Sequence, residues 1–393
     1  MRDAVWVTGI GAVSAAGIGV APLCALLVGG RSAVRSIPSL DCRPAGLAQT
    51  PPRHPAGRHL DRSARFFLQA GEEAFHDAGL KDGHFDPRRC GVLEGSSLGP
   101  LADLLTEHAE VKQSAARPSR LVRYMPGAGG AAFAQLHGVR GPVLHLSAGS
   151  VSAAYAVAEA VEKIRSGRLD LVIAGGAECP LHEEVLASFE AAGILGCRDP
   201  GEAPCRPFDP RRQGTVLGEG AGVLVLERAE HARRRGAWPR AVIRGCGMSC
   251  ESYSMTSPDP SGAGVAEAAR EALAGLGEEP GWIKAHGTGT RLNDAAECRG
   301  LATLFGDTLP EIPITSLKPA LGHCLGASAA VEAVGAILAL QQGIVPPTLG
   351  CDQTDPELPP HRMAKLGCQP AADTVLLLAE SFGGRCAAVA LSL

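Results

Sequence analysis

Short apolar runs that end near glycine alternate with alanine-rich helical segments along this chain of 393 residues. Helical patterns cover residues 152–165 and 264–277. The apolar runs are the predicted strands, at residues 169–175, 223–226, 282–285, 375–378 and 386–391. Strands with helices between them indicate a mostly parallel sheet covered by helices on both faces. We therefore expect an α/β protein.

The stretch from Ala4 to Gly30 holds no charged residue, so it has to be tested as a membrane span. A spanning helix needs about 20 apolar residues. This stretch contains six glycines and Pro22, and its β-branched start ends in a glycine turn. A secretory signal would need a basic start, whereas Arg2 is followed at once by Asp3. We predict a buried strand and then a short helix over residues 22–28, with no membrane association.

The composition indicates a globular protein of two to three structural units. Hydrophobic residues make up 45% and charged residues 20%, and the net charge of −4 gives no electrostatic basis for nucleic-acid binding. The 13 cysteines include no Cys-x-x-Cys pair, so we expect reduced thiols in a cytoplasmic protein and no zinc site. Residues 31–59 are rich in proline and arginine and are expected to be irregular.

Ser150 lies where a buried-looking strand within GPVLHLSAGS (141–150) ends in a small-residue turn, just before an alanine-rich helix. This layout suits a nucleophile at a helix N-terminus, because the helix dipole and free N–H groups stabilise negative charge there. A serine at such a position also serves as an N-cap. The residues alone leave both interpretations open.

The segment KAHGTGT (284–290) also places a reactive group after a strand. His286 is followed by Thr288 and Thr290, whose hydroxyls lie on one side of an extended segment and suit a polar linear ligand. The glycines between them permit close backbone approach to a ligand. A structural histidine followed by turn threonines is the alternative.

The third candidate segment is SLKPALGHCLGASAAVEAV (316–334), with Lys318, His323 and Glu332. His323 is flanked by small residues and could act as an acid or base. Lys318 and Glu332 could take part in the same chemistry, form a structural ion pair, or be two solvated charges.

Taken together and in order, these segments resemble the β-ketoacyl-acyl-carrier-protein synthases (ketosynthases), and most closely the KAS II-like enzymes and type II polyketide ketosynthases. The likeness covers nearly the whole chain. The matching segments are VWVTGIGAVSAAG, GVLEGSSLG, YMPGAGGAAFAQLHGVRGP, DLVIAGGAE, RPFDPRRQGTVLGEGAGVLVLERAEHARRRGA, AHGTGT, SLKPALGHCLGASAAVEA and SFGG. Each segment alone is weak evidence, whereas so many in register are specific.

The resemblance implies a role for each candidate residue. Ser150 stands where the family has its acyl-accepting cysteine. His286 and His323 match the two histidines that assist malonyl decarboxylation and stabilise the enolate. Lys318 matches the active-site lysine, and Glu332 matches the glutamate that supports the network.

The remaining roles concern the oxyanion and the carrier arm. Phe382 falls at the gating phenylalanine, and its backbone N–H with that of Ser150 would form the oxyanion hole. Thr288 and Thr290 match the threonines that bind phosphopantetheine. Because that arm arrives on acyl carrier protein, the resemblance implies no cofactor and no metal of the chain's own.

The resemblance also implies the thiolase-like α/β fold, with two similar halves in α/β/α/β/α layers. We expect an N-terminal half over residues 1–235 and a C-terminal half over residues 236–393. Family members are dimers, so we expect a homodimer or a heterodimer with a sister ketosynthase. Four arginines could meet an acidic carrier protein or form a solvated face instead: Arg62, Arg65, Arg120 and Arg123.

The chain departs from the family at the nucleophile and in the closing loop. The loop AESFGGRC (379–386) is two residues shorter than the family run Asn-Ser-Phe-Gly-Phe-Gly-Gly-Thr-Asn, so only one of its two phenylalanines remains. A helix dipole lowers the pKa of a cysteine enough to give thiolate, but a serine needs a base to take its proton.

Three functional interpretations follow from the serine. The chain is an acyltransferase that uses Ser150 in decarboxylative condensation of acyl and malonyl units, for fatty acid or polyketide biosynthesis. Alternatively, it is a non-elongating partner subunit similar to chain-length factors, or a malonyl decarboxylase. In the third interpretation, the serine is a substitution introduced into an otherwise cysteine-dependent ketosynthase.

Overall fold

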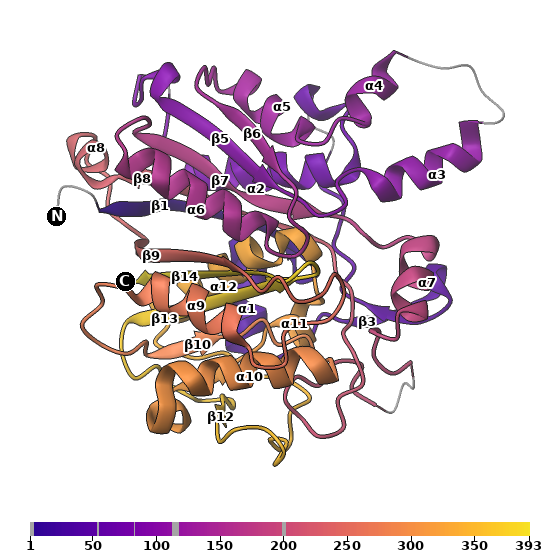
Figure 1. The fold of residues 1–393 in the computed structure, drawn as a ribbon. Coiled ribbons are helices and arrows are strands. Elements are labelled where there is room, and N and C mark those ends of the chain that lie inside the picture. Colours follow the sequence, from indigo (N-terminus) through magenta and orange to yellow (C-terminus); the bar gives the residue numbers. More distant parts are fainter. Residues whose placement is uncertain (1–3, 53–54, 82, 112–117, 199–201) are drawn as a thin grey trace.

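The computed structural model describes residues 4–52, 55–81, 83–111, 118–198 and 202–393. Figure 1 shows the strands in two layers, one above the other. The first layer consists of β1 (Val5–Ser14), β5 (Cys90–Gly95), β6 (Val143–Leu146), β7 (Leu171–Glu178) and β8 (Gly220–Arg228). The second consists of β9 (Ala241–Cys250), β10 (Trp282–Lys284), β11 (Pro313–Thr315), β13 (Thr374–Ser381) and β14 (Arg385–Ser392). The layers join where β1 and β9 pair antiparallel over a few residues.

Both layers repeat one topology. The strand order is β6-β5-β7-β8-β1 in the first layer and β11-β10-β13-β14-β9 in the second. In each layer the first three strands are parallel, and the fourth and fifth each run antiparallel to the strand before them. Two short strands extend the layers: β2 (Gly17–Ile18) pairs with β1, and β12 (Arg362–Met363) pairs with β11.

The expectation of a mostly parallel sheet was wrong, because the sheet is mixed. The second strand of the β13–β14 hairpin reverses direction, and so does β8 against β7. A strand that is buried on both faces is an almost continuous apolar run in either direction. Hydrophobic patterning therefore located these strands without revealing their orientation.

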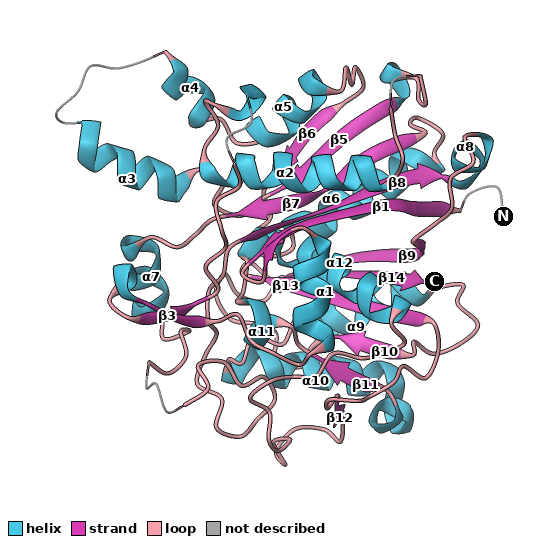
Figure 2. Ribbon diagram, turned by 180° about the vertical axis from the view of Figure 1, so that it is seen from behind, coloured by secondary structure: helices cyan, strands magenta, loops and turns pink. Residues whose placement is uncertain are grey.

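Helices form three layers around and between the two strand layers, which confirms the α/β/α/β/α prediction (Figures 1 and 2). On one outer face lie α2 (Arg62–Asp77) and α5 (Ala128–Leu136), and on the other lie α9 (Ala263–Leu273) and α10 (Arg291–Phe305). The central layer is α6 (Ser152–Arg165) and α12 (Ser328–Gln341). The other described helices are α1 (Val20–Val28), α3 (Leu101–Val111), α4 (Ser119–Arg123), α7 (Glu183–Ala191), α8 (Ala229–Arg234) and α11 (Lys318–Leu321).

The strand and short helix expected near the N-terminus were confirmed, whereas the irregular stretch expected after them was wrong in part. The uncharged stretch forms β1, β2 and α1, and no described helix is long and apolar enough to cross a membrane. Residues 31–59 are not wholly irregular, because β3 (Arg35–Ile37) and β4 (Arg43–Ala45) form a small antiparallel hairpin. Arg53 and His54 of that stretch lie outside the described residues.

Close packing of small residues places α12 in the central layer. The helix is buried on nearly every side, as expected for the sequence SAAVEAVGAILALQ, which has a single charge at Glu332. It lies so close to β8 that a Cβ atom on Gly222 would be 2.3 Å from the amide nitrogen of Val331. Only glycine fits this contact without moving backbone.

Gly222→Ala is therefore expected to destabilise the protein by about 1–3 kcal/mol, because β8 and α12 must separate. The free energy of unfolding in urea measures the effect. Gly277→Ala is the matched control, because a Cβ there meets nothing within 4 Å, and it should change stability by less than about 0.5 kcal/mol. Equal losses in the two variants would contradict this packing argument.

Candidate active site

Ser150 ends the turn between β6 and α6, and its side chain does not cap the helix. Val151 occupies the N-cap position, and no side chain there accepts a helix N–H. Ser152 shapes the turn instead, because its hydroxyl accepts from the N–H of Ala148 at 2.8 Å and donates to the carbonyl of Gly149 at 2.6 Å. The half-buried Ser150 hydroxyl is thus left for other contacts.

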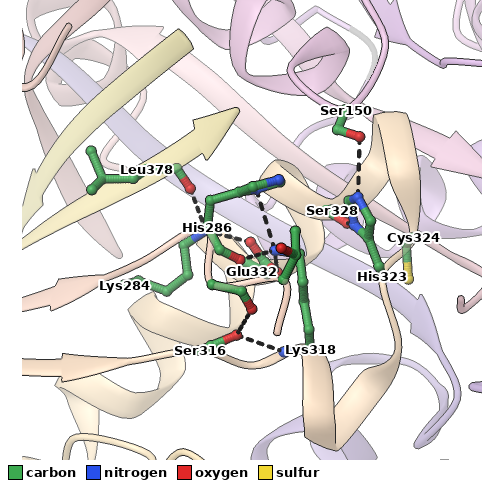
Figure 3. Close-up of polar contacts among 12 residues, drawn as sticks. Ser150, Lys284, His286, Ser316, Lys318, His323, Cys324, Ser328, Glu332 and Leu378 are labelled. Carbon is green, nitrogen blue, oxygen red and sulfur yellow. Dashed lines mark hydrogen bonds and ion pairs between the residues drawn. The ribbon is translucent and has the colours of Figure 1, made fainter. Parts of the chain in front are cut away.

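His323 is the partner of the Ser150 hydroxyl. Its Nε2 lies 3.1 Å from Ser150 Oγ, and its Nδ1 lies 2.9 Å from the hydroxyl of Ser328 (Figure 3). Backbone hydrogen bonds to Val216 and Gly218 fix the segment that carries the ring. When the Nδ1 proton is donated to Ser328, the Nε2 lone pair accepts from Ser150.

Burial keeps this imidazole neutral. Desolvation, with the charges of Lys318 and Lys284, lowers the pKa of His323 well below its usual value of 6.5. A neutral ring nitrogen can accept a proton, which an imidazolium cannot. The same burial makes the imidazolium costly, so His323 is a weaker base than an exposed histidine.

His286 lies beside His323. The ring centroids are 5.3 Å apart and the planes are nearly perpendicular, at 83°. Burial, together with Lys318 and His323, lowers the pKa of His286 well below 6.5. Two neutral imidazoles therefore face the same space.

A buried chain of charges lies behind the histidines. Glu332 accepts from Lys318 at 3.2 Å and from Lys284, and both lysines are buried. Lys318 also donates to the carbonyl of His286, and its Nζ lies 3.4 Å from His286 Nδ1. Lys284 donates to the carbonyl of Leu378 at 2.7 Å, across to β13 (Figure 3). Of the alternatives left open for Lys318 and Glu332, the structure shows a buried ion pair, and its lysine also holds His286.

The segment that carries His286, Thr288 and Thr290 is held by two carboxylates of α10. Glu297 accepts from the backbone N–H groups of His286 and of Gly287, the latter at 2.8 Å, and Asp294 accepts from the N–H of Gly289 at 3.1 Å. The two threonine hydroxyls lie 2.9 Å apart. Burial raises the pKa of Asp294 to about 6 and that of Glu297 to about 7.

Phe382 begins the turn between β13 and β14, and its side chain is 51% exposed. The residue before it, Ser381, accepts from the backbone N–H of Ser150 at 2.9 Å. The family resemblance implied an oxyanion hole formed by that N–H and the N–H of Phe382. In this structure the Ser381 hydroxyl already occupies the Ser150 N–H, a contact that sequence reasoning missed.

One cavity of about 660 Å³ joins these groups. Six of the predicted residues line it: Ser150, His286, Thr288, Thr290, His323 and Phe382. Lys318 and Glu332 do not line it and act from behind His286. Apolar wall is contributed by Phe189, Ile194 and Leu325. The cavity therefore combines the hydroxyls of Ser150, Thr288 and Thr290 with two neutral imidazoles and an apolar lining.

Sequence reasoning missed Lys284, Ser381, Asp294 and Glu297. Lys284 had a usable signal, because a lysine inside the apolar strand WIKA requires a buried partner. Asp294 and Glu297 are three residues apart in the helix that follows the His286 segment, so they face one side. Ser381 had no such signal, since its contact depends on the approach of β13 to the turn at Ser150.

The four arginines proposed for carrier binding are mostly engaged within the chain. Arg62 pairs with Glu219 at 2.5 Å, and Arg120 and Arg123 share Glu107. Arg65 donates to the backbone carbonyl of Asp61 at 3.4 Å. These contacts favour a structural role over a docking surface.

Within the described part of the chain, no cluster of histidine, cysteine or acidic side chains could hold a metal. No disulfide joins the cysteines found there.

Known proteins are similar to this chain over most of its length. The family models described as "Beta-ketoacyl synthase, N-terminal domain" and "Beta-ketoacyl synthase, C-terminal domain" match residues 53–232 and 240–352. The tetracenomycin polyketide synthase ketoacyl synthase alpha subunit of Streptomyces glaucescens is 34% identical over 402 residues, which cover 96% of this chain and 94% of that protein.

Solved structures are similar over the whole chain. A type II polyketide synthase ketosynthase, bound to a hexaketide and in complex with its acyl-carrier protein, has a TM-score of 0.91 and 28% identity, with 100% of both chains covered. The ishigamide ketosynthase/chain length factor has a TM-score of 0.89 and 30% identity, with 100% of this chain and 99% of that chain covered.

The buried ion pairs of Glu332 predict that Glu332→Gln strongly lowers the free energy of unfolding. Loss of this carboxylate leaves two buried ammonium groups without a counter-charge, and breaking a buried ion pair costs about 3–5 kcal/mol. Urea unfolding measures the loss. Glu230→Gln is the control, because Glu230 and Arg234 form a pair at 3.5 Å whose side chains are more than half exposed. That control should cost about 1 kcal/mol or less, and an equal effect in both variants would sink the assignment.

Proposed function

The chain belongs to the β-ketoacyl synthase family, and on that basis we propose that it condenses acyl and malonyl units carried on acyl carrier protein, with Ser150 as acyl acceptor. The observation that supports this most is the 3.1 Å contact between Ser150 Oγ and His323 Nε2. An alcohol needs a proton acceptor to become a nucleophile, because the helix dipole alone cannot ionise it.

Acyl transfer begins with attack of Ser150 Oγ on the thioester carbonyl of an acyl-carrier protein. His323 takes the hydroxyl proton at Nε2 as the C–O bond forms. Collapse of the tetrahedral intermediate breaks the C–S bond, and the proton passes from His323 to the leaving thiolate. The products are acyl-Ser150 and the free thiol of the carrier, and His323 is neutral again.

Condensation uses the two histidines on a malonyl thioester. Loss of carbon dioxide leaves an enolate whose oxygen is stabilised by hydrogen bonds from the site, the role that the resemblance gives to His286 and His323. His286 can donate from Nε2, because its Nδ1 faces the Lys318 ammonium, and His323 donates once its proton has moved from Nδ1 to Nε2. The enolate carbon attacks the acyl-Ser150 carbonyl, and the C–O bond to serine breaks. Ser150 regains a proton from solvent through His323. Lys318 and Glu332 act as positioning residues, because they hold His286.

The carrier arm and the partners follow from the same proposal. Thr288 and Thr290 line the cavity next to His286 and suit the amides of phosphopantetheine.

An apolar surface surrounds β6, the terminal strand of the first layer. Val143 and Leu144 of β6 are exposed, and so are Leu121 and Met125, which precede α5 in the sequence. An open edge strand with apolar side chains favours pairing with a second chain. We propose a homodimer or a heterodimer with a sister ketosynthase, and two halves in this chain at residues 1–235 and 236–393.

One observation favours the alternative of a non-elongating partner subunit or malonyl decarboxylase. The oxyanion formed during acyl transfer would need the N–H of Ser150, and Ser381 occupies that donor. Acylation therefore requires the Ser381 hydroxyl to rotate away. If it does not, malonyl decarboxylation by the two histidines could proceed without an acyl-serine.

Intact-protein mass spectrometry after incubation with an acyl-carrier protein tests the proposal. The acyl mass should appear on the native protein and be absent from Ser150→Ala. Ser147→Ala is the matched control, because this exposed serine lies in the same turn and donates only to the carbonyl of Ser97; it should acylate normally. No adduct, with malonyl-carrier protein still losing carbon dioxide, would favour the decarboxylating alternative.

The rate of Ser150 acylation should also report the low pKa of His323. Burial lowers that pKa well below 6.5, so the ring stays a neutral base as the pH falls. An unperturbed histidine would lose about tenfold in rate between about pH 7.5 and 5.5, whereas acylation here should fall by less than about twofold. Timed mass spectra across this range give the rates, and a tenfold fall would contradict the account.

A further inference from the structure

The cavity wall carries three polar atoms that the proposed mechanism does not use. Glu251 Oε1 and Glu380 Oε1 are buried and have no hydrogen-bond partner within the described chain, and Asn293 Nδ2 is buried beside the carboxylate of Asp294. All three side chains line the same cavity as Ser150. They come from separate elements, since Glu251 follows β9, Asn293 is in the first turn of α10, and Glu380 is near the end of β13.

Glu380 is the most buried of the three, with 5% of its surface exposed. Other buried carboxylates of this region are satisfied by backbone donors: Glu297 holds two N–H groups of the His286 segment, and Asp294 holds those of Phe208 and Gly289. Glu380 has no such donor. A buried polar atom without a partner costs free energy, so its place in a cavity wall points to a ligand.

The surroundings decide what kind of group Glu380 can offer. Burial, with the carboxylates of Glu297, Glu251 and Asp294, raises its pKa well above the usual value. Burial likewise raises the pKa of Glu251. A neutral carboxyl donates through its O–H, and an amide NH₂ such as Asn293 Nδ2 is only a donor. Glu380, as a neutral carboxyl, and the Asn293 amide are therefore the donors of this wall, beside Glu251, whose Oε2 accepts from the N–H of Asp259 at 2.9 Å. The complement of these donors is an acceptor.

We infer that Glu380, with Glu251 and Asn293, forms a specificity-determining subsite that binds a carbonyl oxygen of the carrier-bound thioester. This inference rests on the proposed function, because it takes the cavity to hold such a thioester. The carbonyl belongs either to a 3-oxo group of the acyl chain or to an amide of the pantetheine arm. Both sources share one chemistry, and an alkyl chain without either would leave these polar atoms to water.

Binding in the Ser150→Ala background tests the subsite without any acyl transfer, so failure of the Ser150 chemistry does not affect it. Isothermal titration gives Kd for three probes: 3-oxooctanoyl-pantetheine, octanoyl-pantetheine and the 3-oxooctanoyl thioester of N-acetylcysteamine, which lacks the second amide of the arm. If the chain carbonyl binds here, the 3-oxo group should tighten binding about 5- to 10-fold. If the arm amide binds here, the 3-oxooctanoyl thioester of pantetheine should bind about 5- to 10-fold more tightly than that of N-acetylcysteamine.

Variants assign the gain to Glu380. Glu380→Leu should abolish it, whereas Glu380→Gln, which keeps a donor of similar size, should retain most of it. Asn293→Ala, at a half-buried helix position, should reduce the gain and guards against failure of Glu380→Leu to fold.

Two results would overturn the inference. In one, the ratios of Kd between the probes are the same in Glu380→Leu and Asn293→Ala as in the Ser150→Ala background. The three atoms would then contact only water in the cavity. In the other, 8-aminooctanoyl-pantetheine binds more tightly than the 3-oxo probe and loses that advantage in Glu380→Leu, so that the site holds a cation.

Discussion

The site depends on the close approach of α6 and α12 between the two strand layers. Both helices present alanine and serine to the strands, and strand residues such as Gly95 and Gly222 let backbone pack on backbone. The segments that lead into these helices carry Ser150 and His323. Because the helices share one layer, two residues 173 positions apart come within 3.1 Å. Larger side chains in this layer would separate the nucleophile from its base.

Electrostatics then sets what these groups can do. Burial keeps His286 and His323 neutral, and the nearby lysines reinforce that effect. Glu332 makes the lysines tolerable, because it pairs with both of them. Neutral imidazoles can accept the serine proton and donate to an enolate, but a low pKa limits how much of the imidazolium forms. We therefore expect Ser150 to react slowly as a nucleophile, because His323 is a weak base.

Much of this arrangement was predictable from the sequence. The remaining features were not, because they depend on strand direction or on tertiary contacts. The helix at residues 152–165 was placed with its observed limits, since its alanine-rich pattern and preceding turn are strong local signals. The resemblance brought Ser150, His286 and His323 together before any coordinates. Strand direction was missed, because apolar runs carry no orientation. The contact of Ser381 with Ser150 and the position of Glu380 in the cavity wall depend on tertiary approach, which no local pattern encodes.

The central claim is that His323 is a neutral base directed at Ser150. ¹⁵N NMR of the histidine side chains, with His323 assigned by substitution, tests it directly in the resting protein. The account predicts a neutral ring at pH 7 with the proton on Nδ1, toward Ser328, and an Nε2 resonance that shifts in Ser150→Ala as its hydrogen bond is lost. A proton on Nε2, or an Nε2 resonance unaffected by removal of the Ser150 hydroxyl, would contradict the claim.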